Sequence, residues 1–122
     1  MIIKSGIISD ENRLPKRCLP VSIKNDNGKS TFALYSEGDT FIGVALEDAF
    51  SYKNIDKSIK PTMISVCYGG VVKAISSEAL VAGDIIVPSE DGFKKSDNNH
   101  GVGIVIRGGS ANSYIEILLK NV

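Results

Sequence analysis

Short apolar runs, cut by clusters of Gly, Asn, Asp and Ser, are the feature that most constrains how this chain can fold. Within the runs, apolar and polar residues often alternate, and β-branched residues are frequent, as in TMISV and IIV. A turn signal about every ten residues is typical of the short strands of a sandwich or barrel. We therefore predict an all-β fold: a small antiparallel β-barrel or sandwich with one or two single-turn helices and an extended N-terminal arm.

The alternation predicts strands along most of the chain. They are Met1–Ile8, Leu19–Lys24, Thr31–Tyr35, Thr40–Leu46, Thr62–Tyr68, Val71–Ile75, Asp84–Val87, Gly92–Lys95, Gly101–Arg107 and Ser113–Lys120. Tight hairpins are expected at Asn25–Gly28 and at Asp91-Gly92, because these residues tolerate positive φ. The best candidates for single-turn helices are Glu47–Tyr52 and Ser76–Val81.

Two segments of the chain echo each other. EGDTFIGVALED, from Glu37, and AGDIIVPSEDG, from Ala82, both place Gly-Asp before an apolar run that ends in acidic residues. An aspartate at the entry of a strand can accept hydrogen bonds from nearby backbone N–H groups. We therefore expect similar strand-turn units packed in one barrel.

A looser echo links GVALEDAF, which starts at Gly43, with GVGIVIRGG, which starts at Gly101. Both glycines are expected to admit the chain to a buried strand. The apolar residues that should then fill the barrel are Val44, Leu46, Val102, Ile104 and Ile106. The glycine pairs at 69–70 and 108–109 are expected to form turns or bulges.

The length of 122 residues is that of one domain. We predict an N-terminal arm or edge strand over residues 1–20 and a single β-barrel domain over residues 21–122. The arm either pairs with a strand edge of another chain or is an ordinary edge strand of its own barrel. Its basic cluster, Arg13, Lys16 and Arg17, is interpreted as solvated charge on a mobile arm and not as a phosphate site.

Charge and hydropathy argue against two classes of partner. Lys plus Arg and Asp plus Glu both number 14, so no net field attracts a nucleic acid. No stretch approaches the roughly 20 apolar residues of a membrane helix, and the N-terminal apolar run is too short for a signal peptide. We expect no nucleic acid and no membrane partner, and synthesis in the cytoplasm.

Residues with nucleophilic or acid-base chemistry are few. His100 is the one histidine and lies in a turn-rich stretch. It pairs with Cys67 as base and nucleophile, or with Asp97 as its orienting partner, or it is an exposed loop residue. Cys18 and Cys67 lack C-x-x-C spacing and a neighbouring histidine, so we interpret both as free thiols.

Adjacent carboxylates occur at Glu47-Asp48 and Glu90-Asp91. Neighbouring residues on a strand point to opposite faces, so these pairs are interpreted as rim charges and not as a metal or glycosidase pair. No segment matches the phosphate-binding pattern G-x-x-x-x-G-K-[ST]. We therefore expect no enzyme, no cofactor, and no catalytic, cofactor-binding or metal-binding residues.

From Ser36 to the C-terminus, the order of motifs is more specific than any single one. The motifs are GVALEDA, GGVVKAI, LVAGDIIV, DGFKK, GVGIVI and a closing IEILL. In this order they resemble the small β-barrel decoration, or cement, proteins of tailed-bacteriophage capsids and the related domains of phage head-fibre proteins. Residues 1–35 lie outside the resemblance.

The resemblance implies a structural virion protein on the outer surface of a phage head, made in the host cytoplasm. Its implied partners are the major capsid protein and further copies of itself, with a homotrimer expected. The alternative is a small β-barrel module that binds a ligand or carbohydrate through the loops at Asp97–His100 and Ser110–Ser113. Without Trp, such a module has no strong platform for stacking a sugar.

Overall fold

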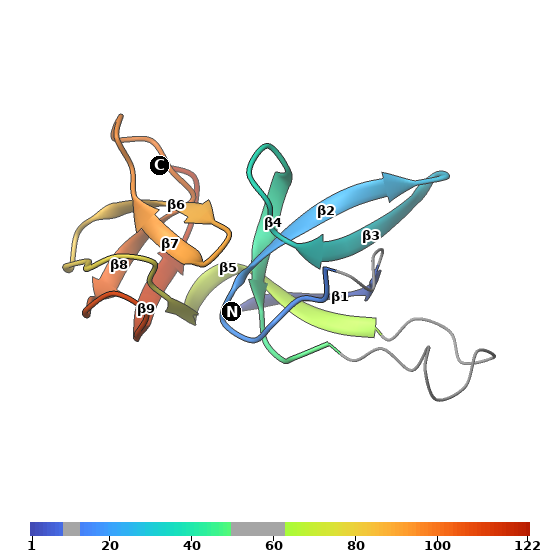
Figure 1. The fold of residues 1–122 in the computed structure, drawn as a ribbon, viewed down its shortest axis with the longest axis horizontal. Coiled ribbons are helices and arrows are strands. Elements are labelled where there is room, and N and C mark those ends of the chain that lie inside the picture. The colour runs from blue at the N-terminus through green and yellow to red at the C-terminus, as the bar shows by residue number, and fades with distance from the viewer. Residues whose placement is uncertain (9–12, 50–62) are drawn as a thin grey trace.

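The computed structural model describes residues 1–8, 13–49 and 63–122, which form a nine-stranded all-β fold. The strands are β1 (Ile2–Ile8), β2 (Pro20–Asp26), β3 (Lys29–Leu34), β4 (Thr40–Ala45), β5 (Met63–Ile75), β6 (Ile85–Ser89), β7 (Gly92–Lys95), β8 (Gly103–Arg107) and β9 (Tyr114–Leu119). Figure 1 shows two lobes joined by the long strand β5. The all-β prediction is confirmed.

The two single-turn helices predicted from the sequence are not seen in the described residues. Residues 76–81 form a bend between two isolated bridges, and residues 47–49 are irregular. The rest of the first candidate, residues 50–52, lies outside the described residues. Helix propensity in the second candidate is overridden because Ser76 and Leu80 each pair with another strand segment, Ser76 with Phe93 and Leu80 with Gly109.

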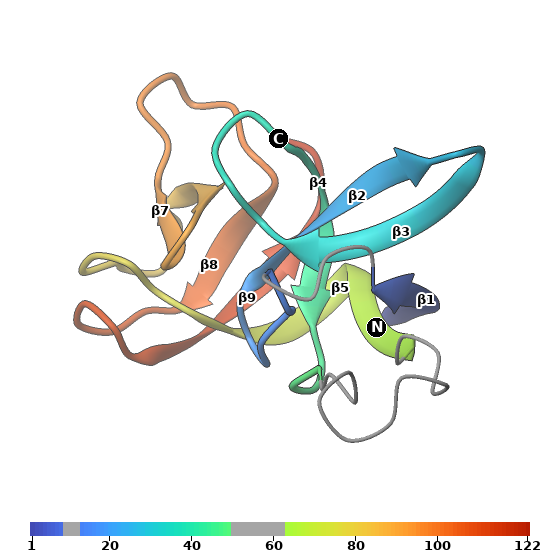
Figure 2. The ribbon, with the colours of Figure 1, turned by 45° about the vertical axis from the view of Figure 1, so that its right-hand side comes forward.

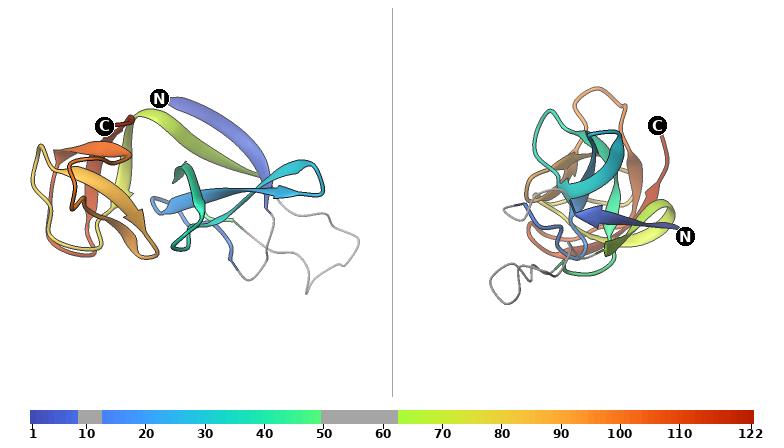
Figure 3. Two further views of the ribbon diagram at one scale, coloured as in Figure 1. Left: turned by 90° about the horizontal axis from the view of Figure 1, so that it is seen from above. Right: turned by 90° about the vertical axis from the view of Figure 1, so that its right-hand side faces the viewer.

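The N-terminal lobe is a closed, five-stranded barrel formed by β1 to β4 and the first part of β5. Figures 1 and 3 show β1 lying along β5, with which it pairs antiparallel from Ile2 to Ile7. On its other edge, Ile7 and Ile8 pair parallel with β3. The barrel is therefore mixed. It differs from the predicted antiparallel barrel in the β1–β3 pairing alone among the described strands, because β1 inserts between two strands that are not its neighbours in sequence.

The C-terminal lobe is an antiparallel sheet in the order β5, β9, β8, β6, β7, which we call the C-terminal sheet. The bridge between Ser76 and Phe93 brings β7 back towards the end of β5, so the sheet curls around its own core. Figure 2 shows this lobe beside the barrel, with the β2–β3 hairpin extending away from it.

Strand β5 takes part in both lobes because it bends at Gly69-Gly70. Gly70 has a φ of 86°, and the pairing with β1 shifts register just before the glycine pair, because Ile2 pairs with Gly69 but Ile3 pairs with Cys67. An added Cβ at Gly70 would lie 3.0 Å from the Met1 backbone. The predicted bulge is confirmed, but the two strands predicted on either side of it are one strand.

Two hydrophobic clusters fill the lobes, and the pair β4–β5 separates them. Val44 pairs with Cys67 and both belong to the C-terminal cluster, whereas the next pair, Ala45 with Val66, belongs to the barrel cluster. All four side chains are at most 1% exposed. Both faces of this strand pair are thus buried, as in the middle layer of a three-layer packing.

The division of the chain into residues 1–20 and 21–122 stays a prediction. Strand β1 closes the barrel of its own chain and does not extend from it. The segment 13–19 leads into β2 and forms backbone hydrogen bonds with both lobes.

The two predicted hairpins are present. β2 and β3 are joined by Asn27-Gly28, whose φ values of 52° and 85° are those of a type I′ turn. β6 and β7 are joined by Glu90-Asp91, because Gly92 already pairs with Ser89 as the first residue of β7. This second turn is one residue earlier than the sequence predicted.

Two predicted core residues, Ile104 and Ile106, are wrong. Val44 is buried, and Leu46 and Val102 pack against the C-terminal cluster, but Ile104 is only partly buried and Ile106 is 44% exposed. Gly103 and Val105 are buried, so the alternation along β8 turns Ile104 and Ile106 to the outer face. The pairing of β8 with β9 shifts register between Val105 and Arg107, and this bulge exposes Arg107 as well.

The approach of β4 to β5 generates a stability prediction. A Cβ at Gly43 would overlap the carbonyl oxygen of Cys67, so we expect Gly43→Ala to lower the free energy of unfolding by about 2–3 kcal/mol. Gly28→Ala is the matched control: nothing lies within 4 Å of its added Cβ, and only the positive φ opposes it. Gly28→Ala should lower the free energy of unfolding by about 1 kcal/mol. Urea unfolding of both variants measures the difference, and equal losses would contradict the packing role of Gly43.

Candidate functional site

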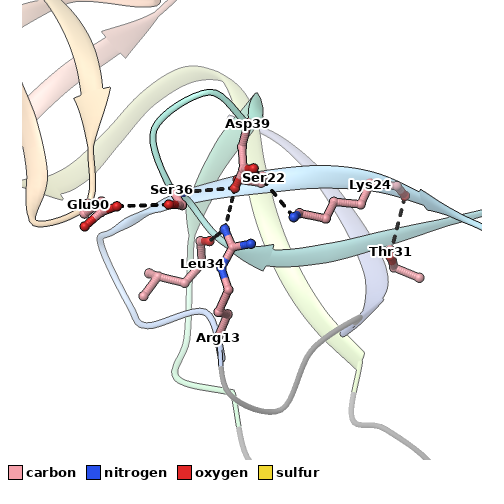
Figure 4. A network of polar contacts seen from close by, with 8 residues as sticks. All are labelled: Arg13, Ser22, Lys24, Thr31, Leu34, Ser36, Asp39 and Glu90. Carbon is pink, nitrogen blue, oxygen red and sulfur yellow. Dashed lines mark hydrogen bonds and ion pairs between the residues drawn. The ribbon is translucent and has the colours of Figure 1, made fainter.

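Asp39 is the centre of the largest polar network in the part of the chain that the structure describes (Figure 4). It lies in the turn before β4, where its Oδ2 accepts hydrogen bonds from the Ser36 backbone N–H at 3.0 Å and the Ser22 hydroxyl at 2.8 Å. The Arg13 guanidinium also donates to Oδ2, and Lys24 Nζ lies 3.5 Å from Oδ1. One carboxylate thus connects β2, β4 and the segment that precedes β2.

The network keeps Asp39 ionised. Burial on its own would raise the pKa of this carboxyl, but the hydrogen bonds from Arg13, Ser22 and Ser36 outweigh it and lower the pKa to about 2. Arg13 also donates to the Leu34 carbonyl at 2.6 Å, so the same guanidinium reaches β3. The hydrogen-bond donors of Arg13, Ser22 and Ser36 are used by Asp39, so this network stabilises the fold.

The second Gly-Asp repeats the turn of the first. Asp84 Oδ2 accepts a hydrogen bond from the Val81 N–H at 2.9 Å, as Asp39 does from Ser36. Lys95 Nζ lies 3.7 Å from Asp84, so this carboxylate also faces a cation. The predicted echo is confirmed, but the prediction of one common barrel is wrong: Asp39 leads into the barrel and Asp84 into the C-terminal sheet.

The basic stretch 13–19 is packed between the lobes and is not a mobile arm. The Cys18 N–H donates to the Ala45 carbonyl at 2.8 Å, and the Ile75 N–H donates to the Cys18 carbonyl at 3.0 Å. The Arg17 N–H donates to Asp48 Oδ1 at 2.9 Å. The charged residues and prolines of this stretch suggested an exposed arm. The sequence did not indicate the packed position, because the hydrogen bonds that hold the stretch are mostly backbone bonds to distant residues.

The structure does not bring the candidate nucleophile and base together. Cys67 is fully buried at the β4–β5 pair, and its Sγ donates to the Gly69 carbonyl at 3.3 Å. His100 lies exposed in the loop after β7, where its backbone N–H donates a hydrogen bond to Asn98 Oδ1 at 3.1 Å. Both cysteines are free thiols, as predicted. Burial raises the pKa of Cys18, which keeps this thiol protonated.

The adjacent carboxylates Glu47 and Asp48 bind different parts of the chain, and so does Glu90. Glu47 accepts a hydrogen bond from the Ser65 N–H at 3.1 Å, whereas Asp48 faces the segment 13–19. Glu90 accepts one from the Ser36 hydroxyl at 2.9 Å, which joins the two lobes. Among the described residues, no three His, Cys, Asp or Glu side chains group closely enough to hold a metal ion.

Aromatic rings also join the lobes, and sequence reasoning missed them. Phe41 of β4 packs edge-on against Tyr35, with centroids 6.4 Å apart, and against Phe93 of β7, at 6.0 Å. Beside them is an open hollow of about 350 Å³. Its walls are Tyr35, Glu37, Val87, Pro88, Ser89, Glu90 and Lys94. Phe93 is 52 residues from Phe41 (93 − 41 = 52), so no local pattern predicts the contact between the lobes.

The polar groups of the two loops proposed for a ligand-binding module form hydrogen bonds with nearby residues of the same chain. The Ser113 hydroxyl donates to the Ser110 carbonyl at 2.6 Å, and Ser76 donates to the same carbonyl at 2.7 Å. In the other loop, the Ser96 hydroxyl and Asn98 Oδ1 are 2.9 Å apart. These polar groups stabilise turns, and the geometry offers no feature that favours a sugar.

The Asp39 network predicts an acid-dependent stability. A carboxyl with a depressed native pKa contributes stability above its unfolded pKa of about 3.9, and this contribution is lost as the pH falls through about 2. We expect Asp39→Asn to lower the free energy of unfolding by about 1–2 kcal/mol at pH 7, after allowance for solvent screening. At pH 2 the loss should be much smaller. Denaturant unfolding at both pH values tests this.

Asp84→Asn is the matched control, because it alters the same kind of turn with a single, more distant cation. It should cost less than Asp39→Asn at pH 7. A loss for Asp39→Asn that stays the same at pH 2 and pH 7 would show that ionisation of this carboxylate does not stabilise the fold.

Comparison with known proteins gives a match in structure alone. No protein-family model and no curated protein sequence matches this chain. Within residues 1–8, 13–49 and 63–122, no helix has the length and apolar character to cross a membrane. The fold is similar to the head fibre gp8.5 N base of bacteriophage phi29, with a TM-score of 0.73 and 11% sequence identity. The match covers 98% of this chain and 95% of that one, so the two share their fold over nearly their whole lengths.

Proposed function

We propose that this chain is a structural virion protein that attaches to the outer surface of a phage head and contacts the major capsid protein. The observation that carries the proposal is the fold shared with the phi29 head-fibre base over nearly the full length of both chains. The order of motifs from Ser36 to the C-terminus supports the same conclusion independently, because the resemblance rests on residues and the match on backbone shape.

The polar groups of the described residues also support a structural role. The Asp39 network, Glu47 and Glu90 hold strands and lobes together, and the Cys67 thiol is buried. A catalytic site needs groups that are free to meet a substrate. A binding role needs only a surface, which this chain retains on the outside of both lobes.

Copies of the chain on a head would lie close together. The formal net charge of zero removes long-range repulsion between them. Contacts between neighbouring copies, in a trimer or a larger group, would add avidity to a modest affinity per site. The protein would be synthesised in the host cytoplasm and function on the capsid surface.

Sedimentation with capsids tests the proposed function. Purified protein is mixed with heads of the cognate phage that lack it, and the pellet is analysed for bound copies. We expect saturable binding with a fixed number of copies per head, because the capsid surface repeats. Heads that already carry the protein serve as the control, since their sites are occupied. Absence of saturable binding to the bare heads would contradict the proposal.

A further inference from the structure

An apolar row crosses the outer face of the C-terminal sheet. The register aligns Val71 of β5 with Leu118 of β9, Leu118 with Ile104 of β8, and Ile104 with Ile85 of β6. The residue that follows each of the four along its strand is buried in the core. Because successive side chains of a strand point to opposite faces, these four face outward. We call them the outer row.

The outer row is exposed where an antiparallel sheet normally presents polar residues. Val71 is 42% exposed, and the other three are partly exposed. The row is built from register, so it forms one continuous strip across four strands and not a set of scattered side chains. The largest apolar patch on a monomeric protein is about 300–600 Å² and is often functional, so the strip is a candidate contact surface.

A charged row borders the outer row on the same face. Glu116 of β9 pairs with Lys73 of β5 on one side and Arg107 of β8 on the other. Arg107 Nε lies 3.6 Å from the Glu116 carboxylate, and Lys73 Nζ lies 5.3 Å from the centre of the Tyr114 ring. Two cations and one carboxylate make this border net positive.

We infer that the outer row is the surface through which the chain contacts the capsid shell. The facing surface of the shell protein is apolar, with a carboxylate opposite Lys73 and Arg107. This inference rests on the proposed attachment to a phage head and adds the face and the chemistry of the contact.

The size and charge of this face favour a shell over a second copy of the chain. Four strands about 4.8 Å apart, with about five residues each, cover roughly 300 Å². A stable contact between two proteins buries about 800 Å² on each. Two copies that met through this face would also bring two net-positive borders together. A capsid lattice compensates for the small area, because neighbouring copies support each other's attachment. A carboxylate on the shell would also face the positive border, where a second copy would present another positive border.

Paired substitutions test the row. Leu118→Lys places a charge in the row, and its flexible stem can reach solvent, so the fold should persist. Val81→Lys makes the same kind of change at a more exposed apolar residue, 66% exposed, in the loop before β6. We expect Leu118→Lys to weaken binding to bare heads about tenfold or more, and Val81→Lys about twofold or less.

A charge reversal tests the border without touching the core. Lys73→Glu should weaken head binding about threefold to tenfold at low salt, with a smaller effect at high salt. Lys94→Glu makes the same charge change in the wall of the hollow between the lobes and should have little effect. Thermal unfolding checks that all variants fold. If Leu118→Lys does not fold, Lys73→Glu decides, because Lys73 is exposed.

Each outcome has a separate meaning. Wild-type protein that does not bind bare heads contradicts the proposed function, and the inference fails with it. Wild-type binding that is unchanged by Leu118→Lys and Lys73→Glu overturns the inference alone. Sedimentation velocity without heads supplies the last readout: if Leu118→Lys lowers the mass of the free protein and leaves head binding intact, the row joins copies of the chain, which also overturns the inference.

Discussion

The pairing of β4 with β5 is the interaction on which the rest of the structure depends. Here Val44 and Cys67 face one core while Ala45 and Val66 face the other, so a single strand pair completes both lobes. Without the β4–β5 pair, one side of each hydrophobic core would be uncovered. Two cores that share a layer bury more apolar surface than either would alone, which matters in a chain of 122 residues. The bare backbone of Gly43 lets the two strands come close enough.

Around this shared layer, the lobes are joined by contacts of different kinds. The segment 13–19 binds the end of β4 and the end of β5 through the Cys18 backbone. Phe41 packs against Phe93, and Ser36 donates to Glu90. These contacts come from segments that are far apart in the sequence, so they add to the shared strand pair in joining the two lobes.

Local features of the sequence predicted local features of the fold. Asn27-Gly28 forms the expected hairpin, and Asp39 and Asp84 form the expected turns, because the residues that define each turn are adjacent in the chain. Predictions that depended on distant partners were less successful. Residues 76–81 form bridges to β7 and to Gly109 in place of the predicted helix. Ile104 and Ile106 face outward, because packing buries the alternate residues Gly103 and Val105.

The sequence by itself determined where strands and turns occur, and that the chain is all-β, because alternation and turn chemistry act over a few residues. Only the tertiary structure decided that β1 pairs with β3 and β5, that Arg13 binds Asp39, and that two cores share one strand pair. It also decided the outer row, which exists only when four strands take one register. Register between strands that are distant in the chain is set by packing of both faces, and no pattern within a single strand contains that information.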